Sequence, residues 1–233
     1  MNAPLLLCVN DELDNHKHLG VTTKVNFCPW GTLLVITPRS DGRVRLCADY
    51  KVTVNPLLEP VHYPIPRTGE LFTKIHGSKY FCILDLTNAY LHIPLDDESK
   101  KIAAISMHCG TYPAERLFLG LSIAPAKYHA ITAPIINSIP NCIAYFDDLL
   151  IFGKTKAQCA DALSKAFETL DKFNIKLNKK KCKFFLRRLK YLGYIISENG
   201  LEKDPEKMKA IEETPVPANV NGSVLCELHT EHC

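Results

Sequence analysis

Two adjacent aspartates interrupt an apolar stretch, and this interruption constrains the fold more than any other feature of the chain. Asp147 and Asp148 lie between residues 143–146 and 149–152, two apolar and aromatic runs with high β propensity. The pattern predicts a β-hairpin that carries both carboxylates at its turn. Because an ionised carboxylate leaves water only at high cost unless it meets a cation, the pair indicates a cation site. A hairpin tip whose aspartates simply face water is the alternative, since Asp is common in turns.

A second acidic position strengthens the cation-site interpretation. Residues 80–84 form another strand-like apolar run, which ends on Asp85, and Tyr90 follows five residues later. A strand with one aspartate and a hairpin with two are the arrangement needed to hold two divalent metals. Carboxylate oxygens suit Mg²⁺, and two such ions about 3.5–4 Å apart catalyse phosphoryl transfer. These residues therefore predict polynucleotide synthesis, with metal-dependent cleavage as an alternative.

Several motifs in a fixed order resemble the palm motifs of reverse transcriptases. They are Asp85-Leu86 with Tyr90, Leu117-Phe118-Leu119-Gly120, Tyr145-Phe146-Asp147-Asp148, Leu177-Asn178-Lys179-Lys180-Lys181 and Tyr191-Leu192-Gly193-Tyr194. Upstream, Pro29-Trp30-Gly31, Asp41-Gly42 and residues 45–50 are similar to the fingers region of that family. The chain most resembles the Pol polyproteins of gypsy-type LTR retrotransposons, over about residues 11–220.

The resemblance implies an α+β fold, with the fingers and palm of a right-hand polymerase and an antiparallel palm sheet packed on helices. The expected parts are an N-terminal segment with a fingers hairpin (1–60), a first palm part (61–92), a second fingers part (93–124) and a palm with the Asp-Asp hairpin and a primer-grip-like strand (125–203). Residues 204–220 would begin the connection to a missing thumb, and 221–233 look unrelated to the family. The chain therefore resembles a fragment of a longer element.

Local patterns predict the individual elements. A hairpin is expected from residues 33–36 and 44–46 around the Ser40-Asp41-Gly42 turn, and helices over 69–75, 124–139 with a kink or break at Pro134, and 156–173. Thr155 and Gln158 form a capping-box pattern before the last of these. A strand over 191–196 closed by Asn199-Gly200, and a helix that starts at Asp204-Pro205, complete the prediction.

The resemblance assigns the catalytic and metal-binding roles to Asp85, Asp147 and Asp148. Asp85 and Asp147 would make the principal contacts to two Mg²⁺ ions, for which Mn²⁺ is a possible substitute, and Asp148 would contribute less directly. Tyr90 matches an aromatic position that lies against the sugar of the nucleotide and excludes a 2′-hydroxyl. Ordinary core packing is the alternative for Tyr90.

Four further residues are expected at the incoming deoxynucleoside triphosphate. Arg45 corresponds to the fingers arginine of the family, and Arg39 lies near the position of a second cation that binds the triphosphate. Guanidinium groups suit bidentate phosphate contacts. Leu119 and Gly120 belong to the turn that supports the templating base. Here the chain departs from the family, which usually has Leu-Pro-Phe-Gly, so the floor of the nucleotide pocket is changed.

A basic segment is the expected contact for an RNA or DNA template and its primer. Residues 172–190 hold nine Lys or Arg and no Asp or Glu, although the net charge of the chain is only +3. Such a stripe attracts phosphates. By resemblance, one of Lys179, Lys180 and Lys181 protonates the leaving pyrophosphate, and Tyr191-Leu192-Gly193 grips the primer. A solvated lysine-rich connection is the alternative reading.

Composition adds expectations about location and partners. The ten cysteines include no CxxC pair, and no secretory signal or membrane-length stretch is apparent. We therefore expect an intracellular protein, cytoplasmic or nuclear, that does not bind a membrane. Other Pol-derived chains are possible partners. Cys226, His229, His232 and Cys233 have no familiar zinc-site spacing. A catalytically silent remnant that only binds nucleic acid is the alternative to an active polymerase.

Overall fold

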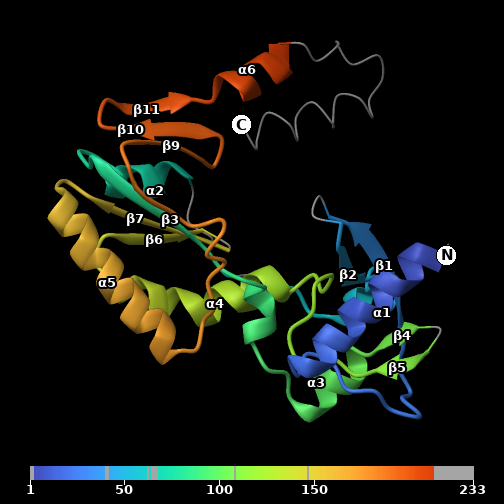
Figure 1. The fold of residues 1–233 in the computed structure, drawn as a ribbon. Helices are drawn as coiled ribbons and strands as arrows, with labels where there is room; N and C mark the ends of the chain where they lie inside the picture. The colour runs from blue at the N-terminus through green and yellow to red at the C-terminus, as the bar shows by residue number, and fades with distance from the viewer. Residues whose placement is uncertain are drawn as a thin grey trace. The chain divides into compact units, whose positions relative to one another are not determined.

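The computed structural model describes residues 3–39, 42–61, 63, 68–107, 109–145 and 147–212 (Figure 1). The chain forms two compact units, each assembled from two separate stretches of sequence. Unit 1 comprises Met1–Ile65 and Thr87–Pro134, and unit 2 comprises Pro66–Leu86 and Ile135–Cys233. No helix in the described ranges is long and apolar enough to cross a membrane.

Unit 1 is a small sheet covered by short helices. Its strands lie in the order β2 (Val44–Ala48), β1 (Thr32–Pro38), β4 (Ile105–Met107) and β5 (Gly110–Tyr112). The predicted hairpin is confirmed, because β1 pairs antiparallel with β2 from Leu34↔Ala48 to Pro38↔Val44; Ser40 and Asp41 of its turn lie outside the described residues. The helical segments are α1 (Ala3–His18), η1 (Asn55–Leu57), η2 (Ala89–His92), α3 (Asp97–Ile102) and most of α4 (Ala124–Asn137).

Unit 2 contains an antiparallel sheet that carries the aspartates. Its order is β6 (Cys142–Tyr145), β7 (Asp148–Gly153), β3 (Tyr80–Asp85) and β8 (Lys183–Leu186), with α5 (Lys156–Lys172) packed on it and α2 (Thr68–Ile75) in the same unit (Figure 1). Strand β7 is buried at every position after Asp148, and β3 is buried or partly buried along its whole length, as expected of the two central strands. The hairpin around Asp147 is therefore present as predicted, although Phe146 lies outside the described residues.

Helix α5 shows where local pattern succeeds and where it fails. The Thr155 hydroxyl accepts from the Gln158 amide at 3.2 Å, as a cap should, but the Gln158 side chain accepts from Lys154 N at 2.9 Å, one residue beyond the expected partner. The apolar face consists of Cys159, Ala162, Leu163, Ala166 and Leu170. Phe167 and Phe173 are 40% and 47% exposed, because they lie beside the buried stripe rather than on it.

The predicted strand over residues 191–196 is confirmed only for Tyr194–Ile196, because Tyr191 belongs to a different strand. A turn at Leu192-Gly193, with φ of +51° and +79°, separates β9 (Arg188–Tyr191) from β10 (Tyr194–Ser197), and β11 (Gly200–Lys203) adds a third strand. Positive φ at both central residues is the geometry that a two-residue hairpin loop requires. Apolar continuity across Leu192 hid this turn. The three-stranded sheet buries Leu189, Tyr191 and Ile196 against residues of β3, β6 and β7.

One helix end also differs from expectation. Helix α4 continues through Pro134, so the chain does not break there, and it ends at Asn137 rather than Ile139. Helix α6 (Pro205–Glu212) begins where predicted, and Glu206 N donates to Asp204 Oδ1 at 3.2 Å. Residues 213–233, including the four potential zinc ligands, lie outside the described part of the chain.

Candidate active site

Strand pairing brings together the three aspartates found in the sequence, which we call the carboxylate site (Asp85, Asp147 and Asp148). Asp85 ends β3 and Asp148 begins β7, and the two are direct partners in the antiparallel ladder. Directly opposed residues project from the same face of a sheet, with Cβ atoms about 4.5–5.5 Å apart. Asp147 precedes Asp148 in the turn, and its carbonyl accepts from Leu86 N at 3.0 Å. The ladder register thus gathers carboxylates from two distant segments.

The electrostatics of the carboxylate site favour a cation. The pKa of Asp148 is raised, first by burial and then by the negative charges of Asp85 and Asp147, while Lys181 opposes the shift. Carboxylates that repel one another in a partly desolvated place gain from a positive ion between them. Oxygen donors of this kind fit Mg²⁺. Among the described residues, however, no three His, Cys, Asp or Glu side chains already lie in a metal-holding arrangement.

One lysine of the basic segment reaches the carboxylate site. Lys181 Nζ lies 3.1 Å from Asp85 Oδ2. Its loop is attached to the end of β3, because Leu177 forms a bridge with Leu86 and Asn178 N donates to Asp85 O at 2.9 Å. Lys179 and Lys180 are exposed and make no ion pair with another described residue. The structure therefore separates Lys181 from its two neighbours, which the sequence alone did not.

The other end of the basic segment is largely neutralised. Lys190 Nζ lies 2.5 Å from Asp204 Oδ2 and 2.7 Å from Glu206 Oε2, and Arg188 lies 3.3 Å from Glu202. Arg187 donates to the Tyr80 hydroxyl at 2.8 Å. Acids that follow the basic segment in the chain thus return to pair with it. Positive charge that is not paired in this way is therefore confined to the first half of the basic segment 172–190, around the loop that holds Lys181.

The primer-grip-like motif has its aromatic ring inside unit 2. Tyr191 is 4% exposed and packs in the apolar cluster beneath β3 and β7. Its hydroxyl has no hydrogen-bond partner among the described residues. Leu192 and Gly193 form the half-buried turn between β9 and β10. The turn residues are therefore more accessible than Tyr191.

The turn that contains Leu119 and Gly120 is tightly held in unit 1. Gly120 has φ of +109°, and a Cβ there would lie 2.1 Å from the Ala48 carbonyl oxygen. The Gly120 carbonyl accepts from Asn55 Nδ2 at 3.0 Å, and Leu119 O accepts from Ala48 N at 3.3 Å. Only glycine fits so close an approach of two backbones. The end of β2 and this turn are therefore locked together.

Tyr90 lies in η2 of unit 1, where both of its proposed roles remain compatible with its surroundings. Its ring is half-buried and meets Tyr128 edge to face, with ring centroids 5.2 Å apart. It also packs against the main apolar cluster of the unit. Packing of this kind fixes the ring, which both a core residue and a steric gate need. The gate role stays a prediction.

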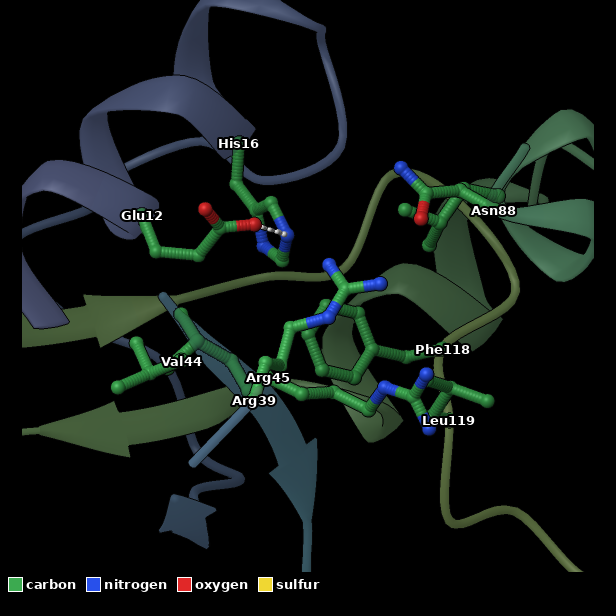
Figure 2. A pocket seen from close by; sticks show the side chains of 10 residues that line it. Glu12, His16, Arg39, Val44, Arg45, Asn88, Phe118 and Leu119 are labelled. Carbon is green, nitrogen blue, oxygen red and sulfur yellow. Dashed lines mark ion pairs between the residues drawn. The ribbon is translucent and has the colours of Figure 1, made fainter. Parts of the chain in front are cut away.

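Unit 1 contains a pocket that both predicted arginines line (Figure 2). We call it the arginine pocket; its volume is about 40 Å³, and its lining consists of Glu12, His16, Arg39, Val44, Arg45, Leu46, Asn88, Leu91, Phe118 and Leu119. Arg39 follows β1, Arg45 lies in β2, and Leu119 belongs to the locked turn. Two guanidinium groups facing one cavity fit an anion. Phe118, which departs from the family pattern, is buried below them.

Helix α1 supplies two pocket residues that the sequence analysis missed. His16 Nε2 lies 3.4 Å from Glu12 Oε1, and the imidazole meets Phe118 edge to face at 5.7 Å (Figure 2). Burial lowers the pKa of His16, and the Glu12 carboxylate partly opposes this. Nδ1 has no hydrogen-bond partner among the described residues. The signal in the sequence was a Glu and a His four residues apart, which share one face of a helix.

The fold resembles the fingers and palm of a right-hand polymerase, and the carboxylate site lies on its antiparallel sheet. The chain belongs to the family described as "Reverse transcriptase (RNA-dependent DNA polymerase)", whose pattern matches residues 37–196. The family predicted from the motifs is confirmed, and the gypsy type remains compatible with its relatives.

Several relatives are polyproteins from transposons. The chain is 32% identical over 76% of its length to the retrovirus-related Pol polyprotein from transposon 297, and 30% identical over 80% to that from transposon 412, both of Drosophila melanogaster. It spans only 17% and 15% of those proteins. A foamy viral protease-reverse transcriptase solved with double-stranded DNA shares the fold, with a TM-score of 0.87 over 99% of this chain and 40% of that one, at 21% identity.

Proposed function

We propose that this chain is the RNA-directed DNA polymerase domain of a retrotransposon, which adds deoxynucleotides to the 3′-hydroxyl of a primer on an RNA or DNA template. The observation that supports the proposal most strongly is the pairing of Asp85 with Asp148 across β3 and β7, with Asp147 beside them. Three mutually repelling carboxylates at a sheet end have no evident structural use. They have a clear use as ligands for divalent cations.

In this proposal Asp85 and Asp147 are the principal ligands, with Asp148 supporting them. Two Mg²⁺ ions, or Mn²⁺ in their place, would activate the primer hydroxyl and neutralise the charge of the leaving pyrophosphate. The chain's own contribution is positioning: the ladder between β3 and β7 fixes Asp85 and Asp148, and the Leu86–Asp147 hydrogen bond of 3.0 Å holds the turn. Fixed carboxylates need little reorganisation when the reaction begins.

The arginine pocket would receive the triphosphate of the incoming nucleotide. Arg39 and Arg45 supply the charge, and the locked turn at Leu119-Gly120 forms one side. Tyr90 would then exclude a 2′-hydroxyl, and Lys179, Lys180 and the Leu192-Gly193 turn would contact template or primer. Partner chains from the same polyprotein and an intracellular location, cytoplasmic or nuclear, complete the proposal.

We further assign the parts of the hand to the two units. The fingers correspond to residues 1–60 and 93–124, most of unit 1, and the palm to 61–92 and 125–203, most of unit 2. Residues 204–220 would begin the connection that leads away from the palm. The carboxylate site then belongs to the palm and the arginine pocket to the fingers, as their chemistry suggests.

Primer extension on poly(rA)·oligo(dT) with dTTP and Mg²⁺ tests the proposal. We expect incorporation by the wild type, and at least about a 100-fold loss in Asp147→Asn, because a ligand for the reacting charges is removed. Asp161→Asn is the matched control, since Asp161 is exposed on α5. Equal activity in wild type and Asp147→Asn would overturn the metal assignment.

A silent remnant that only binds nucleic acid is the second candidate. It is favoured by the absence, among the described residues, of a ready-formed metal arrangement. It predicts no incorporation by well-folded wild-type protein, together with template binding that weakens steeply with salt and is unchanged in Asp147→Asn. Extension by the wild type would exclude it.

A further inference from the structure

We propose that Lys181 is the built-in counter-ion of the carboxylate site, and that a divalent cation binds there by displacing its ammonium group from Asp85. The inference rests on the proposed function in one respect only, that Asp85, Asp147 and Asp148 are metal ligands. It adds a role for Lys181 before any substrate binds. By competing for Asp85, this lysine lowers the affinity of the site for a divalent cation.

The position of Lys181 follows from how its loop is attached. Leu177 bridges Leu86, Asn178 N donates to Asp85 O at 2.9 Å, and Lys181 N donates to Asn178 O at 3.0 Å. The loop backbone is therefore fastened to the strand that carries Asp85. Of the three consecutive lysines, Lys179 and Lys180 are exposed, and Lys181 contacts the carboxylate of Asp85. The contact results from the fold of the loop rather than from a chance meeting of two surface chains.

The charges at the site make the contact useful and also temporary. Lys181 brings one positive charge to a site of three carboxylates and pairs with Asp85. A divalent ion that takes Asp85 Oδ2 as a ligand competes directly with the ammonium 3.1 Å away, because two positive charges so close together repel each other. Either the metal or Lys181 occupies the position.

The exposed fractions of the two side chains indicate that replacing the Lys181 ammonium by a metal ion costs little free energy. The Lys181 side chain is 61% exposed, whereas that of Asp85 is 18% exposed. Exposed lysine–carboxylate pairs are weak, since the long side chain is flexible and well hydrated when it leaves. The ammonium can therefore swing into water while Asp85 stays in place. In the metal-free state Lys181 offsets part of the negative charge of the carboxylates, and it leaves Asp85 at low cost when a metal ion binds.

Manganese binding in the absence of nucleotide and nucleic acid tests this directly. Free Mn²⁺ is followed by electron paramagnetic resonance as it is titrated into wild type, Lys181→Met and Lys180→Met. We expect Lys181→Met to bind Mn²⁺ about two- to fivefold more tightly, the range that an exposed ion pair can supply. Lys180→Met is the matched control and should bind as the wild type does. Lys181→Arg keeps the charge and should not bind more tightly.

Two results would overturn the inference. Unchanged or weaker Mn²⁺ binding by Lys181→Met, from protein whose thermal unfolding matches the wild type, would show that Lys181 does not compete. Lack of Mn²⁺ binding by every variant would show that no ion displaces it. Tighter binding by Lys181→Met, abolished by the second substitution Asp85→Asn, would support it. Primer extension is a separate measurement, so an inactive chain that shows the tighter binding fails the proposed function and not this inference.

Discussion

The carboxylate site of unit 2 and the arginine pocket of unit 1 are opposite in charge and also in construction. The carboxylate site is made by one ladder, in which Asp85 and Asp148 are direct partners. The arginine pocket collects residues from α1, the β1–β2 hairpin, η2 and the turn at Leu119-Gly120 (Figure 2). A ladder needs only correct register to place two side chains, whereas the pocket needs four segments to pack correctly. The pocket should therefore be the more easily damaged of the two by changes at its supports.

Paired glycine substitutions test that difference and should produce the largest effect. A Cβ on Gly120 would lie 2.1 Å from the Ala48 carbonyl oxygen, at φ of +109°, and a Cβ on Gly153 would lie 2.6 Å from Cys159 N. We expect Gly120→Ala to lower the free energy of unfolding by about 2–5 kcal/mol, from backbone strain together with overpacking. Gly153→Ala should lose about 1–3 kcal/mol, from overpacking alone.

Urea unfolding measures both variants, and binding of dTTP to each shows whether the arginine pocket survives. If Gly120→Ala were as stable as the wild type, the lock between β2 and the Leu119-Gly120 turn would not be as described. A larger loss in Gly153→Ala than in Gly120→Ala would reverse the comparison between the two units.

An intermediate effect is expected at the carboxylate site, with the opposite sign. Asp148→Asn should raise the free energy of unfolding of the metal-free protein by about 0.5–2 kcal/mol at pH 7.5, because it removes a repelling charge. The raised pKa of Asp148 means that the wild type regains this stability on acidification, as the carboxyl takes up a proton.

The two proteins should thus converge in stability as the pH falls toward the pKa of Asp148. Urea unfolding in EDTA over a pH series measures this, with Asp161→Asn as the exposed control on α5. A loss of stability in Asp148→Asn at pH 7.5 would mean that its charge is fully compensated in the folded protein.

The smallest effect should come from His16 in the arginine pocket. Burial holds its pKa below 6.5, so the unfolded chain takes up a proton more readily than the folded one. Stability from neutral His16 is therefore present above pH 6.5 and is lost as the pH falls below it. His16→Gln should reduce the loss of unfolding free energy between pH 7.5 and 5.5. The reduction should be smaller than the change in unfolding free energy that Asp148→Asn produces at pH 7.5.

Buried His129, whose pKa is lowered in the same way, gives the matched comparison. His129→Gln should remove its own part of the decline and leave the His16 part in place. A pH profile that is the same in His16→Gln and wild type would show that Glu12 fully offsets the burial of the imidazole.

Short-range pattern explains most of the elements that were predicted correctly. The apolar runs around Asp147 and before Asp85 became β6, β7 and β3, because buried strands need such runs. Thr155 and Asp204-Pro205 marked two helix starts, since a cap depends only on residues within one turn. The Leu192-Gly193 turn was missed because its flanking residues are apolar on both sides, and Pro134 did not end α4.

The sequence by itself determined the family of this protein and the residue types at its candidate sites: three aspartates in strand contexts, two arginines around a hairpin, and a lysine-rich loop. Only the tertiary structure decided that Asp85 faces Asp148, that Lys181 rather than Lys179 or Lys180 reaches Asp85, and that Glu12 and His16 line the arginine pocket. The physical reason is range. Propensity and capping act within a few residues, whereas strand register, loop attachment and helix docking depend on partners far along the chain.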